Sequence, residues 1–285
     1  MSGGLRAALA PGLEDRVLER AASRERCMDV ASLLEHRPWI LCNDPFPHIR
    51  ATAVFTPAIY RELAAAFATI LNGQTLPSWP EARLVRNMPG YDASAVDFDG
   101  PVGWPFSVFA SRSWHDLFAR LFGIDAIGCV SGGLHHHAID SRDGFVHNDL
   151  NPGWFVAPGT GAEIVTPRSD LCDYRHGTTP AGAKVMTRET IRGIAIVYYL
   201  NNPEWRPGDG GETGLYRTWR DAVVHPVVAV PPLNNSLVAF ECTPGSFHSF
   251  RKNTRHPRNS VIVWLHREKT AVLERWGDAA IMRWP

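Results

Sequence analysis

The sequence predicts a mainly β protein with flanking helices, in which the strands form a sandwich or a barrel. From residue 132 onward, short runs of β-branched and aromatic residues are separated by glycine, proline and asparagine. Before residue 125, apolar residues instead recur at helical spacing. The strands expected from this pattern are 134–139, 144–147, 191–200, 223–230, 236–241, 246–251 and 258–266.

Three segments near the N-terminus are expected to be helical. Residues 12–36 carry spaced apolar positions among charged ones, which indicates one or two amphipathic helices. Residues 57–71 begin with Pro57, and proline is favoured at the first position of a helix. A third set repeats at helical spacing and ends near Gly123: Trp114, Leu117, Phe118, Leu121 and Phe122. We expect these helices to buttress the sheet, and a short helix to follow at 270–281.

The chain is divided into three parts by these patterns. Residues 1–43 are expected to form an N-terminal helical extension, 44–267 the main domain, and 268–285 a C-terminal helical cap. Within the main domain, 44–125 form the helical buttress. The segment 150–190 is too long and too rich in proline, glycine and charge for an ordinary connection, so we expect an inserted lid over a binding pocket.

Composition indicates which binding partners and which cellular compartment to expect. A chain of 285 residues can bury a full core. Its formal net charge of zero indicates no bulk attraction to nucleic acid or to an anionic membrane. The five cysteines are scattered and form no CxxC pair, which suits a reducing cytoplasm better than a disulfide framework. No window approaches the length and hydrophobicity of a membrane span, and no basic, apolar leader opens the chain.

Two distant motifs carry the chemistry. His147 and Asp149 lie in the sequence Gly-Phe-Val-His-Asn-Asp-Leu, and His248 follows Gly-Ser-Phe far downstream. Two imidazoles and one carboxylate form the facial triad that holds iron(II) and leaves coordination positions open on one side. With neutral histidines and an ionised carboxylate the site has a net charge of about +1, which suits an acidic, chelating cosubstrate. Each of these residues alone would more often be an ordinary turn or core residue. Their occurrence together, in this order, favours the interpretation that they are metal ligands.

Arg258 is the expected anchor for the far carboxylate of such a cosubstrate. Residues 246–251 and 258–266 are interpreted as a hairpin that brings Arg258 back beside His248. Strand alternation places Ser260 on the same face as Arg258. Three other cations in this region are more typical of a solvated turn, whereas Arg258 begins an apolar strand, where an unpaired charge would be costly. The rivals are Arg251, Lys252 and Arg255.

The ordered set resembles the 2-oxoglutarate- and iron(II)-dependent oxygenase superfamily, in its prolyl-4-hydroxylase-like branch, over about residues 44–267. The matching segments are His147-Asn-Asp149, Tyr198-Tyr-Leu-Asn201, Gly210-Gly-Glu212, Asn235-Ser-Leu-Val-Ala-Phe240, His248 and Arg258-Asn-Ser260. The resemblance implies a double-stranded β-helix, a cupin-like jelly roll. It also implies an enzyme with iron(II), 2-oxoglutarate and O2. The metal ligands, and hence the catalytic residues, would be His147, Asp149 and His248, and Arg258 with Ser260 would bind the cosubstrate.

One departure concerns the cosubstrate pocket. Many relatives place a tyrosine shortly before the first iron histidine, where this chain has His135, His136 and His137. Alternation sends His135 and His137 to one face of the strand and His136 to the other. Either His135 or His137 is expected to replace the tyrosine, and a pocket-lining role is favoured over a second metal site.

The activity implied by the resemblance is hydroxylation of an unactivated C–H bond, with release of succinate and CO2. The expected substrate is a small molecule, an amino acid or a peptide. Arg192, Trp154 and Asn201 are candidates to contact it, Arg192 being equally compatible with a structural role. The same oxidant could instead support desaturation, cyclisation or demethylation. A non-catalytic, cupin-like metal-binding or sensor protein is the alternative from another class. Neither nucleic acid nor membrane is expected as a partner, and a homodimer is left open.

Overall fold

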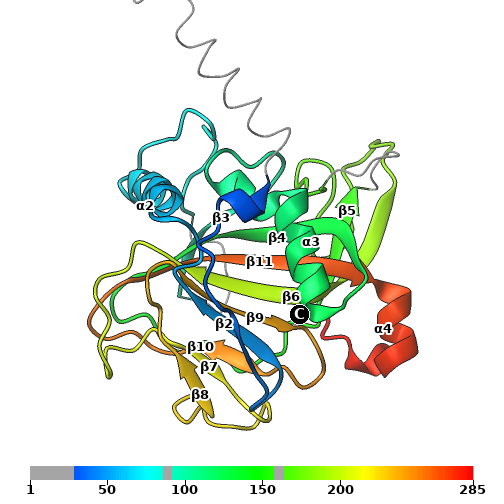
Figure 1. Cartoon of the computed structure of the whole chain (residues 1–285). Helices are drawn as coiled ribbons and strands as arrows, with labels where there is room; N and C mark the ends of the chain where they lie inside the picture. Colours follow the sequence, from blue (N-terminus) through cyan, green and yellow to red (C-terminus); the bar gives the residue numbers. More distant parts are fainter. Residues whose placement is uncertain (1–28, 86–91, 157–163, 285) are drawn as a thin grey trace, which may run out of the picture.

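The protein is mainly antiparallel β-structure, as the sequence predicts. The computed structural model describes residues 29–85, 92–156 and 164–284. Within these residues an eight-stranded sheet has the order β1-β2-β9-β6-β11-β4-β3, with β5 pairing to β6, and a three-stranded sheet has the order β10-β7-β8 (Figure 1). The expected fold class, a jelly roll with flanking helices, is therefore confirmed.

The large sheet contains β1 (Ile40–Cys42), β2 (His48–Thr52), β3 (Ser94–Asp97), β4 (Ala126–His137), β5 (Pro152–Val156), β6 (Thr187–Tyr199), β9 (Ser236–Glu241) and β11 (Arg258–Glu268). The small sheet contains β7 (Thr213–Leu215), β8 (Val228–Val230) and β10 (His248–Phe250). The described helices are α2 (Pro57–Leu71), α3 (Arg112–Phe122) and α4 (Lys269–Trp276), with 3-10 turns η1 (Val30–Ser32), η2 (Phe106–Ala110) and η3 (Asp278–Ala280).

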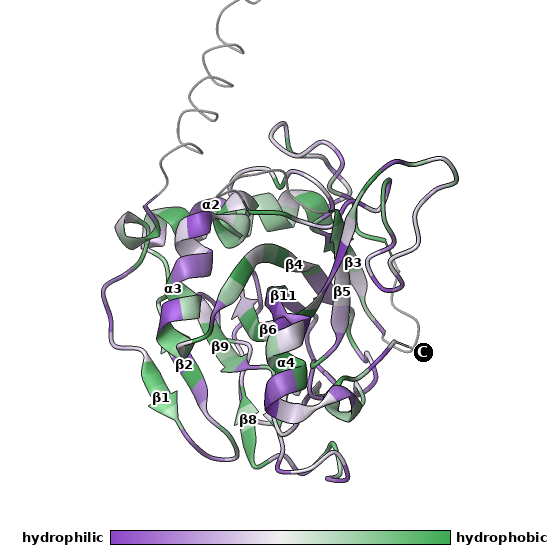
Figure 2. Cartoon of the chain, turned by 90° about the vertical axis from the view of Figure 1, so that its right-hand side faces the viewer, coloured by the Kyte–Doolittle hydropathy of each residue, from purple (hydrophilic) through white to green (hydrophobic). Residues whose placement is uncertain are grey.

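The helices α2 and α3 lie outside the curved sheet (Figure 2). α3 begins where the Ser111 side chain accepts a hydrogen bond from the Trp114 N–H, and it ends at Gly123, whose φ of 63° is the left-handed conformation glycine adopts without strain. Trp114 and Phe118 of α3 are fully buried, as is Phe67 of α2 at 1% exposure. The apolar stripes predicted from the sequence thus cover the outer face of the sheet.

Strand β11 separates two hydrophobic cores. Val261, Val263 and Leu265 point toward the helices and join the outer core. Ile262 and Trp264 alternate with them and point to the inner side, between the two sheets. The inner side also carries the polar residues of the candidate site, so one strand both closes the core and displays the functional groups.

The expected hairpin between residues 246–251 and 258–266 is wrong. β10 pairs with β7 in the small sheet, whereas β11 lies between β4 and β6 in the large sheet. The intervening residues cross from one sheet to the other. Arg258 therefore approaches β10 across the jelly roll, where its guanidinium carbon lies 5.4 Å from the centre of the Phe250 ring, and not along a hairpin.

Other expected strands differ in extent. β4 begins at Ala126, well before residue 134, because Gly132 and Gly133 permit close strand packing here and do not end the strand. A Cβ at Gly132 would lie 2.4 Å from the Ile262 carbonyl oxygen. The expected strand at 144–147 is reduced to an isolated bridge between His147 and His248, and only Val228–Val230 of the expected 223–230 is a strand.

The outer parts of the chain are described incompletely. Most of the helices expected at 12–36 lie outside the described residues, and β1 occupies the end of the expected extension. In the expected lid, 157–163 also lie outside the description, while β5 and the beginning of β6 form its two ends. None of the helices described is both long and apolar enough to cross a membrane.

Candidate metal centre and cosubstrate pocket

His147 and His248 are held together through their backbones. The His147 N–H donates to the His248 carbonyl at 3.0 Å, and the His248 N–H donates to the His147 carbonyl at 2.8 Å. This bridge joins the loop after β4 to the first residue of β10. Asp149 follows in the left-handed region with φ of 60°, a conformation that aspartate tolerates better than most residues. The turn directs its carboxylate toward both imidazoles.

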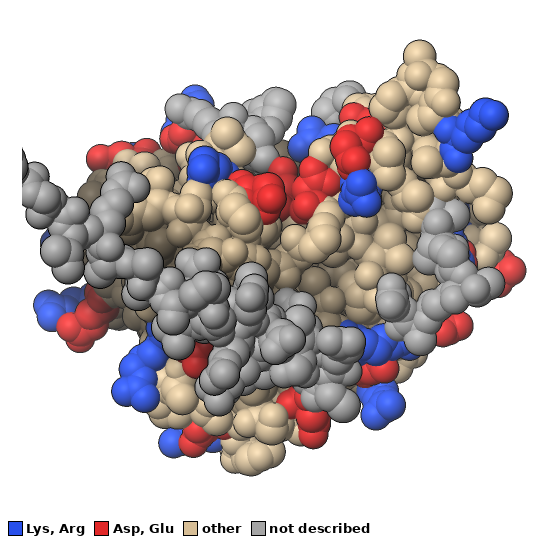
Figure 3. All heavy atoms as spheres, turned by 90° about the horizontal axis from the view of Figure 1, so that it is seen from above, with Lys and Arg blue, Asp and Glu red and all other residues tan. Residues whose placement is uncertain are grey.

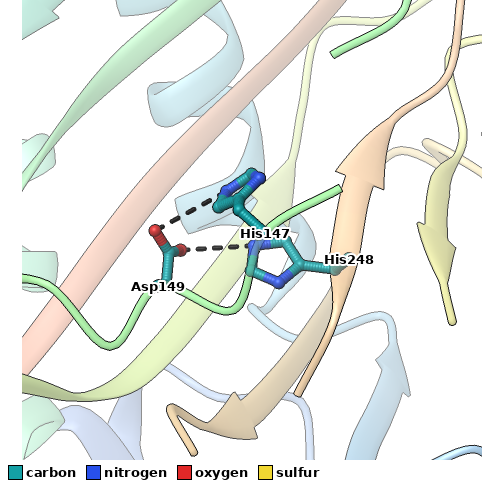
Figure 4. Close-up of side chains that lie close together, drawn as sticks. All are labelled: His147, Asp149 and His248. Atoms are coloured by element: carbon teal, nitrogen blue, oxygen red, sulfur yellow. Dashed lines mark ion pairs between the residues drawn. The ribbon is translucent and has the colours of Figure 1, made fainter. Parts of the chain in front are cut away.

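The three side chains converge on one point (Figure 4). Their potential ligand atoms all lie within 4.8 Å of one another. His147 Nε2 is 3.6 Å from Asp149 Oδ1, and His248 Nε2 is 3.2 Å from Asp149 Oδ2. Each imidazole places Nδ1 against a carbonyl two residues earlier, Phe145 at 2.9 Å and Ser246 at 3.0 Å. Nδ1 is therefore the protonated nitrogen in each ring, and each Nε2 is the ligand atom.

The carboxylate of Asp149 is held from its other side. Arg192 Nη1 donates to Oδ1 at 2.6 Å, and Trp264 Nε1 donates to Oδ2 at 2.7 Å. Burial raises the pKa of the Asp149 carboxyl. The charge of Arg192, followed by the interaction with His147, lowers it by more, so the pKa lies well below its usual range. Each carboxylate oxygen has a second lone-pair direction for a metal.

The donor set fits iron(II). Two imidazole nitrogens and one carboxylate oxygen are the ligands of the facial triad. Burial, followed by the neighbouring His248, lowers the pKa of His147 to about 4, so its ring is neutral near pH 7 as a ligand must be. His147, Asp149 and His248 are the residues that would hold the ion.

Arg258 lies deeper between the sheets and is 3% exposed. Its Nη1 donates to Ser260 Oγ at 3.1 Å, and its Nη2 donates to Thr213 Oγ1 at 3.2 Å. The guanidinium carbon is 5.2 Å from the centre of the Tyr199 ring and 5.4 Å from that of Phe250. The Tyr199 hydroxyl also donates to Thr213, at 2.6 Å. One cation and three hydroxyls thus form a compact site suited to a carboxylate.

His135 and His137 both face this pocket. The register pairs His137 with Arg258 and His135 with Ser260, and paired residues share a face. The His137 ring stacks on Phe250, with centroids 3.8 Å apart. Burial, followed by the charge of Arg258, lowers the pKa of His135 to about 3 and that of His137 well below 6.5. Two neutral histidines therefore stand where the resemblance led us to expect a tyrosine.

Of the substrate candidates, Arg192 lies at the centre of the site. It is 7% exposed, contacts Asp149, and lies over the Trp264 ring with 3.7 Å between the guanidinium carbon and the ring centre. Arg192 is thus a hydrogen-bond partner of the Asp149 carboxylate. Its position next to the candidate metal ligand still allows it to face a substrate.

The expected role of Trp154 at the substrate mouth is not supported by its position. Gly153 and Phe155 face His266, so Trp154, which alternates with them, points the other way. A Cβ built on Gly177 would lie 2.4 Å from the Trp154 ring, so the two residues are in close contact. Trp154 therefore anchors the described part of the insertion at the sheet edge.

The expected role of Asn201 is also not supported. Its carbonyl accepts from Asn259 Nδ2 at 2.7 Å, and its N–H lies 3.4 Å from the Tyr60 hydroxyl of α2. Asn259 alternates with Arg258 and bonds to His136 at 2.8 Å on the outer side. Asn201 therefore joins the strand end to the helical layer, on the side away from the pocket.

Four site residues were missed in the sequence: Tyr199, Thr213, Trp264 and Tyr174. Tyr199 stands in a segment that carries the resemblance. Trp264 is six residues beyond Arg258 in the same strand, so alternation could have placed it on the site face. Nothing local points to Thr213 or Tyr174, which reach the site only through tertiary contacts.

The surface in Figure 3 shows charges of both signs interspersed around its rim, with uncharged residues between them. That mixture agrees with the formal net charge of zero.

Comparison with known proteins gives matches of one kind. Residues 172–266 match a model described as the 2OG-Fe(II) oxygenase superfamily, a range that includes His248, Arg258 and Ser260. Prolyl 3,4-dihydroxylase OGFOD1 of Ostreococcus tauri is 32% identical over 128 residues, 41% of this chain and 24% of the relative. Prolyl 3-hydroxylase OGFOD1 of Xenopus laevis is 38% identical over 78 residues, 26% of this chain and 15% of the relative. The chain thus spans a quarter or less of these curated relatives.

Solved structures with similar folds are more distant in sequence. A Pseudomonas putida prolyl-4-hydroxylase is 13% identical, with a TM-score of 0.47 over 78% of this chain and 92% of that one. A Trichoplax adhaerens prolyl hydroxylase, in complex with a hypoxia inducible factor oxygen degradation domain peptide fragment, is 13% identical. Its TM-score is 0.46, over 94% of this chain and 97% of that one.

Proposed function

The chain belongs to the 2-oxoglutarate- and iron(II)-dependent oxygenase superfamily, in its prolyl-4-hydroxylase-like branch, and on that premise we propose that it hydroxylates an unactivated C–H bond. The cofactor of this superfamily is iron(II), and its cosubstrates are 2-oxoglutarate and O2. The reaction would release succinate and CO2. The observation that carries the proposal is the convergence of His147, Asp149 and His248, with the buried cation Arg258 packed against Phe250 of the strand that supplies His248.

Each residue has a defined task in this proposal. His147, Asp149 and His248 hold the iron, which when bound supplies the oxidising chemistry. Arg258 and Ser260 bind the distal carboxylate of 2-oxoglutarate, and Thr213 and Tyr199 hold the guanidinium and complete the polar pocket. The apolar walls of the inner core exclude water from the reacting atoms.

We propose a prolyl residue in a peptide or protein as the first substrate to test. Support comes from the names of the two curated relatives, both prolyl hydroxylases. A small molecule or a free amino acid is the second candidate. Arg192, beside Asp149 and against the Trp264 ring, is the side chain proposed to contact the substrate.

The test is 2-oxoglutarate turnover by the purified chain with iron(II), with and without proline-containing peptides. Succinate formation that depends on the peptide, with a peptide mass gain of one oxygen atom, is the expected result. His248→Ala should abolish both signals. Loss of two hydrogens would indicate desaturation or cyclisation, and loss of a methyl group demethylation. Metal binding without any succinate, with or without candidate substrates, would favour the non-catalytic sensor.

A cytoplasmic location is also proposed. Among the described residues, Cys42, Cys129, Cys172 and Cys242 are unpaired thiols, which suits a reducing compartment. Cell fractionation with the native protein would test it, and recovery only in an oxidising compartment would contradict it.

A further inference from the structure

A buried row of polar side chains runs from Asp149 to the edge of the large sheet. Arg192 bonds Asp149 at 2.6 Å on one side and the Tyr174 hydroxyl at 3.3 Å on the other. The Tyr174 hydroxyl is 2.9 Å from Ser131 Oγ, and Ser131 Oγ is 2.9 Å from His266 Nε2. The proposed chemistry at the iron uses none of these last three residues.

The proton positions at the far end of the row follow from its contacts. Thr190 Oγ1 donates to the Gly153 carbonyl at 2.8 Å, because a carbonyl can only accept. His266 Nδ1 lies 2.9 Å from the same hydroxyl and must therefore carry the proton. Burial, then the charge of Arg192, keeps the pKa of His266 well below 6.5, so Nε2 is unprotonated and accepts.

Two hydroxyls lie within hydrogen-bond distance of His266 Nε2, Ser131 at 2.9 Å and Tyr174 at 3.3 Å, and the shorter contact identifies Ser131 as the donor. Ser131 donates to His266 Nε2 and is left to accept from the Tyr174 hydroxyl. The Tyr174 oxygen in turn accepts from Arg192 Nε. The Tyr174 oxygen can accept from Arg192 Nε whichever hydroxyl donates to His266, and this contact fixes the edge of the guanidinium that lies away from Asp149.

Tyr174 is itself held firmly in place. Its carbonyl accepts from the Trp154 N–H of β5 at 2.8 Å. Asp173 Oδ1 accepts from the N–H groups of Arg175 and His176 at 2.8 and 2.7 Å, which closes a tight turn around Tyr174. The part of the insertion between β5 and β6 that the structure describes thus delivers one hydroxyl to the inner face of the sheet.

Two tryptophan rings also pack against the Arg192 guanidinium. Its central carbon lies 3.7 Å from the Trp264 ring centre and 5.0 Å from that of Trp284. Trp284 is fixed by a 2.8 Å hydrogen bond from Nε1 to the Pro152 carbonyl. These rings limit the movement of the Arg192 guanidinium, and the contact of Nε with Tyr174 restricts its rotation further.

We propose that Tyr174 is a positioning residue that orients Arg192 and, through it, the carboxylate of Asp149. This proposal rests on the iron site proposed above and adds to it a role for the insertion. Groups that hydrogen-bond a metal-ligating carboxylate set its direction and its basicity. A carboxylate free to turn would offer the ion a poorer ligand, although all three ligands remained present.

The alternative is a purely structural row, whose loss lowers stability and leaves the metal unaffected. Tyr198→Phe provides the matched control. Tyr198 adjoins Tyr199 in β6 and faces the outer core, and its hydroxyl bonds Asn235 Oδ1 at 2.9 Å. Tyr174→Phe and Tyr198→Phe each remove one hydroxyl. The Tyr174 hydroxyl contacts Arg192, Ser131 and His266, whereas the Tyr198 hydroxyl bonds Asn235 and does not touch Arg192.

The experiment is a titration of the whole chain with cobalt(II), a spectroscopic probe for iron(II). The visible absorption of the bound ion reports both affinity and ligand geometry. We expect Tyr174→Phe to weaken cobalt binding by about tenfold and to change the shape of the spectrum, with Tyr198→Phe matching the wild type in both. Ser131→Ala, which removes the acceptor of the Tyr174 hydroxyl and the donor to His266 but leaves the Tyr174–Arg192 contact, should give a smaller change of the same sign and serves if Tyr174→Phe does not fold.

The possible failures are distinguishable. If the wild-type chain binds no cobalt, the proposed iron site itself is wrong. If the wild type binds and Tyr174→Phe binds equally well with an unchanged spectrum, the positioning role is wrong and the iron site stands. Equal weakening in Tyr174→Phe and Tyr198→Phe would also overturn the positioning role, because the effect would then follow general stability.

Discussion

At the scale of single residues, the stability of the site depends on hydrogen bonds to its few buried charges. Asp149 is 4% exposed and receives hydrogen bonds on both oxygens. Arg258 is buried among hydroxyls and aromatic faces. A buried charge without such partners would cost several kcal/mol. The buried charges are therefore stable only while all their partners are present. Single substitutions within the cluster should strongly reduce stability or activity.

Arg258→Ala should raise the apparent KM for 2-oxoglutarate by about ten- to a hundredfold, because hydrogen bonds to charged groups contribute about 1.5–3 kcal/mol. Arg255→Ala is the control: its side chain is 73% exposed and lies 3.6 Å from Asp209 in the turn between the sheets. Steady-state kinetics with varied 2-oxoglutarate measure both. A severe Arg255→Ala and a mild Arg258→Ala would mean that the anchor has been assigned to the wrong arginine.

At the scale of elements, the jelly roll positions its ligands by placing consecutive strands in opposite sheets. β10 supplies His248 from the small sheet, and β11 supplies Arg258 and Ser260 from the large sheet. The insertion contributes through the turn around Tyr174, which packs on Trp154 of β5. That the insertion acts as a lid stays a prediction. The anchored turn around Tyr174 is the part of the insertion at which substitutions can be tested.

Gly177→Ala should destabilise this turn. Gly177 has φ of 71°, and an added Cβ would lie 2.4 Å from the Trp154 ring. Gly182→Ala is the matched control, because Gly182 has φ of 84° with no atom within 4 Å of the added Cβ. Both variants incur about 1–2 kcal/mol for the left-handed backbone. Urea unfolding should show a further loss for Gly177→Ala alone, and equal losses would show that the contact with Trp154 is not tight.

At the scale of the whole molecule, four buried or largely buried histidines are neutral. Burial is the first cause in each case, and it lowers the pKa of His135 to about 3 and of His147 to about 4. The pKa values of His137 and His266 are also well below 6.5. In the unfolded chain these groups return to about 6.5. The unfolded state therefore binds more protons below that pH, and the stability of the fold becomes dependent on pH.

The metal-free protein should lose stability as the pH falls below about 6.5, by about 1.4 kcal/mol for each such histidine at pH 5.5. The sign follows because a depressed histidine pKa gives stability that is present above the unfolded value and lost as the pH falls toward the folded one. Carboxylates contribute little at pH 5.5, since their ordinary pKa values lie near 4. Urea unfolding at pH 7.5 and 5.5 measures the difference, and equal stability would contradict buried neutral histidines.

Metal binding should raise stability by mass action. Cobalt(II) at a hundredfold excess over its dissociation constant should add about 2.7 kcal/mol to the free energy of unfolding. His248→Ala should remove this gain, whereas Arg255→Ala should keep it. Thermal or urea unfolding with and without the ion provides the measurement. An equal gain in His248→Ala would indicate binding elsewhere on the chain.

The sequence by itself determined the fold class, the His-Asp-His set and the Arg258–Ser260 pair. These follow from local information: alternation within a strand, residue chemistry and the order of motifs. Tertiary structure alone decided the rest. It placed β10 and β11 in different sheets, joined Thr213 to Arg258, and brought Tyr174 and Trp284 onto Arg192. Such contacts join residues far apart in the chain, and their register is set by cross-sheet packing, which no local sequence pattern encodes.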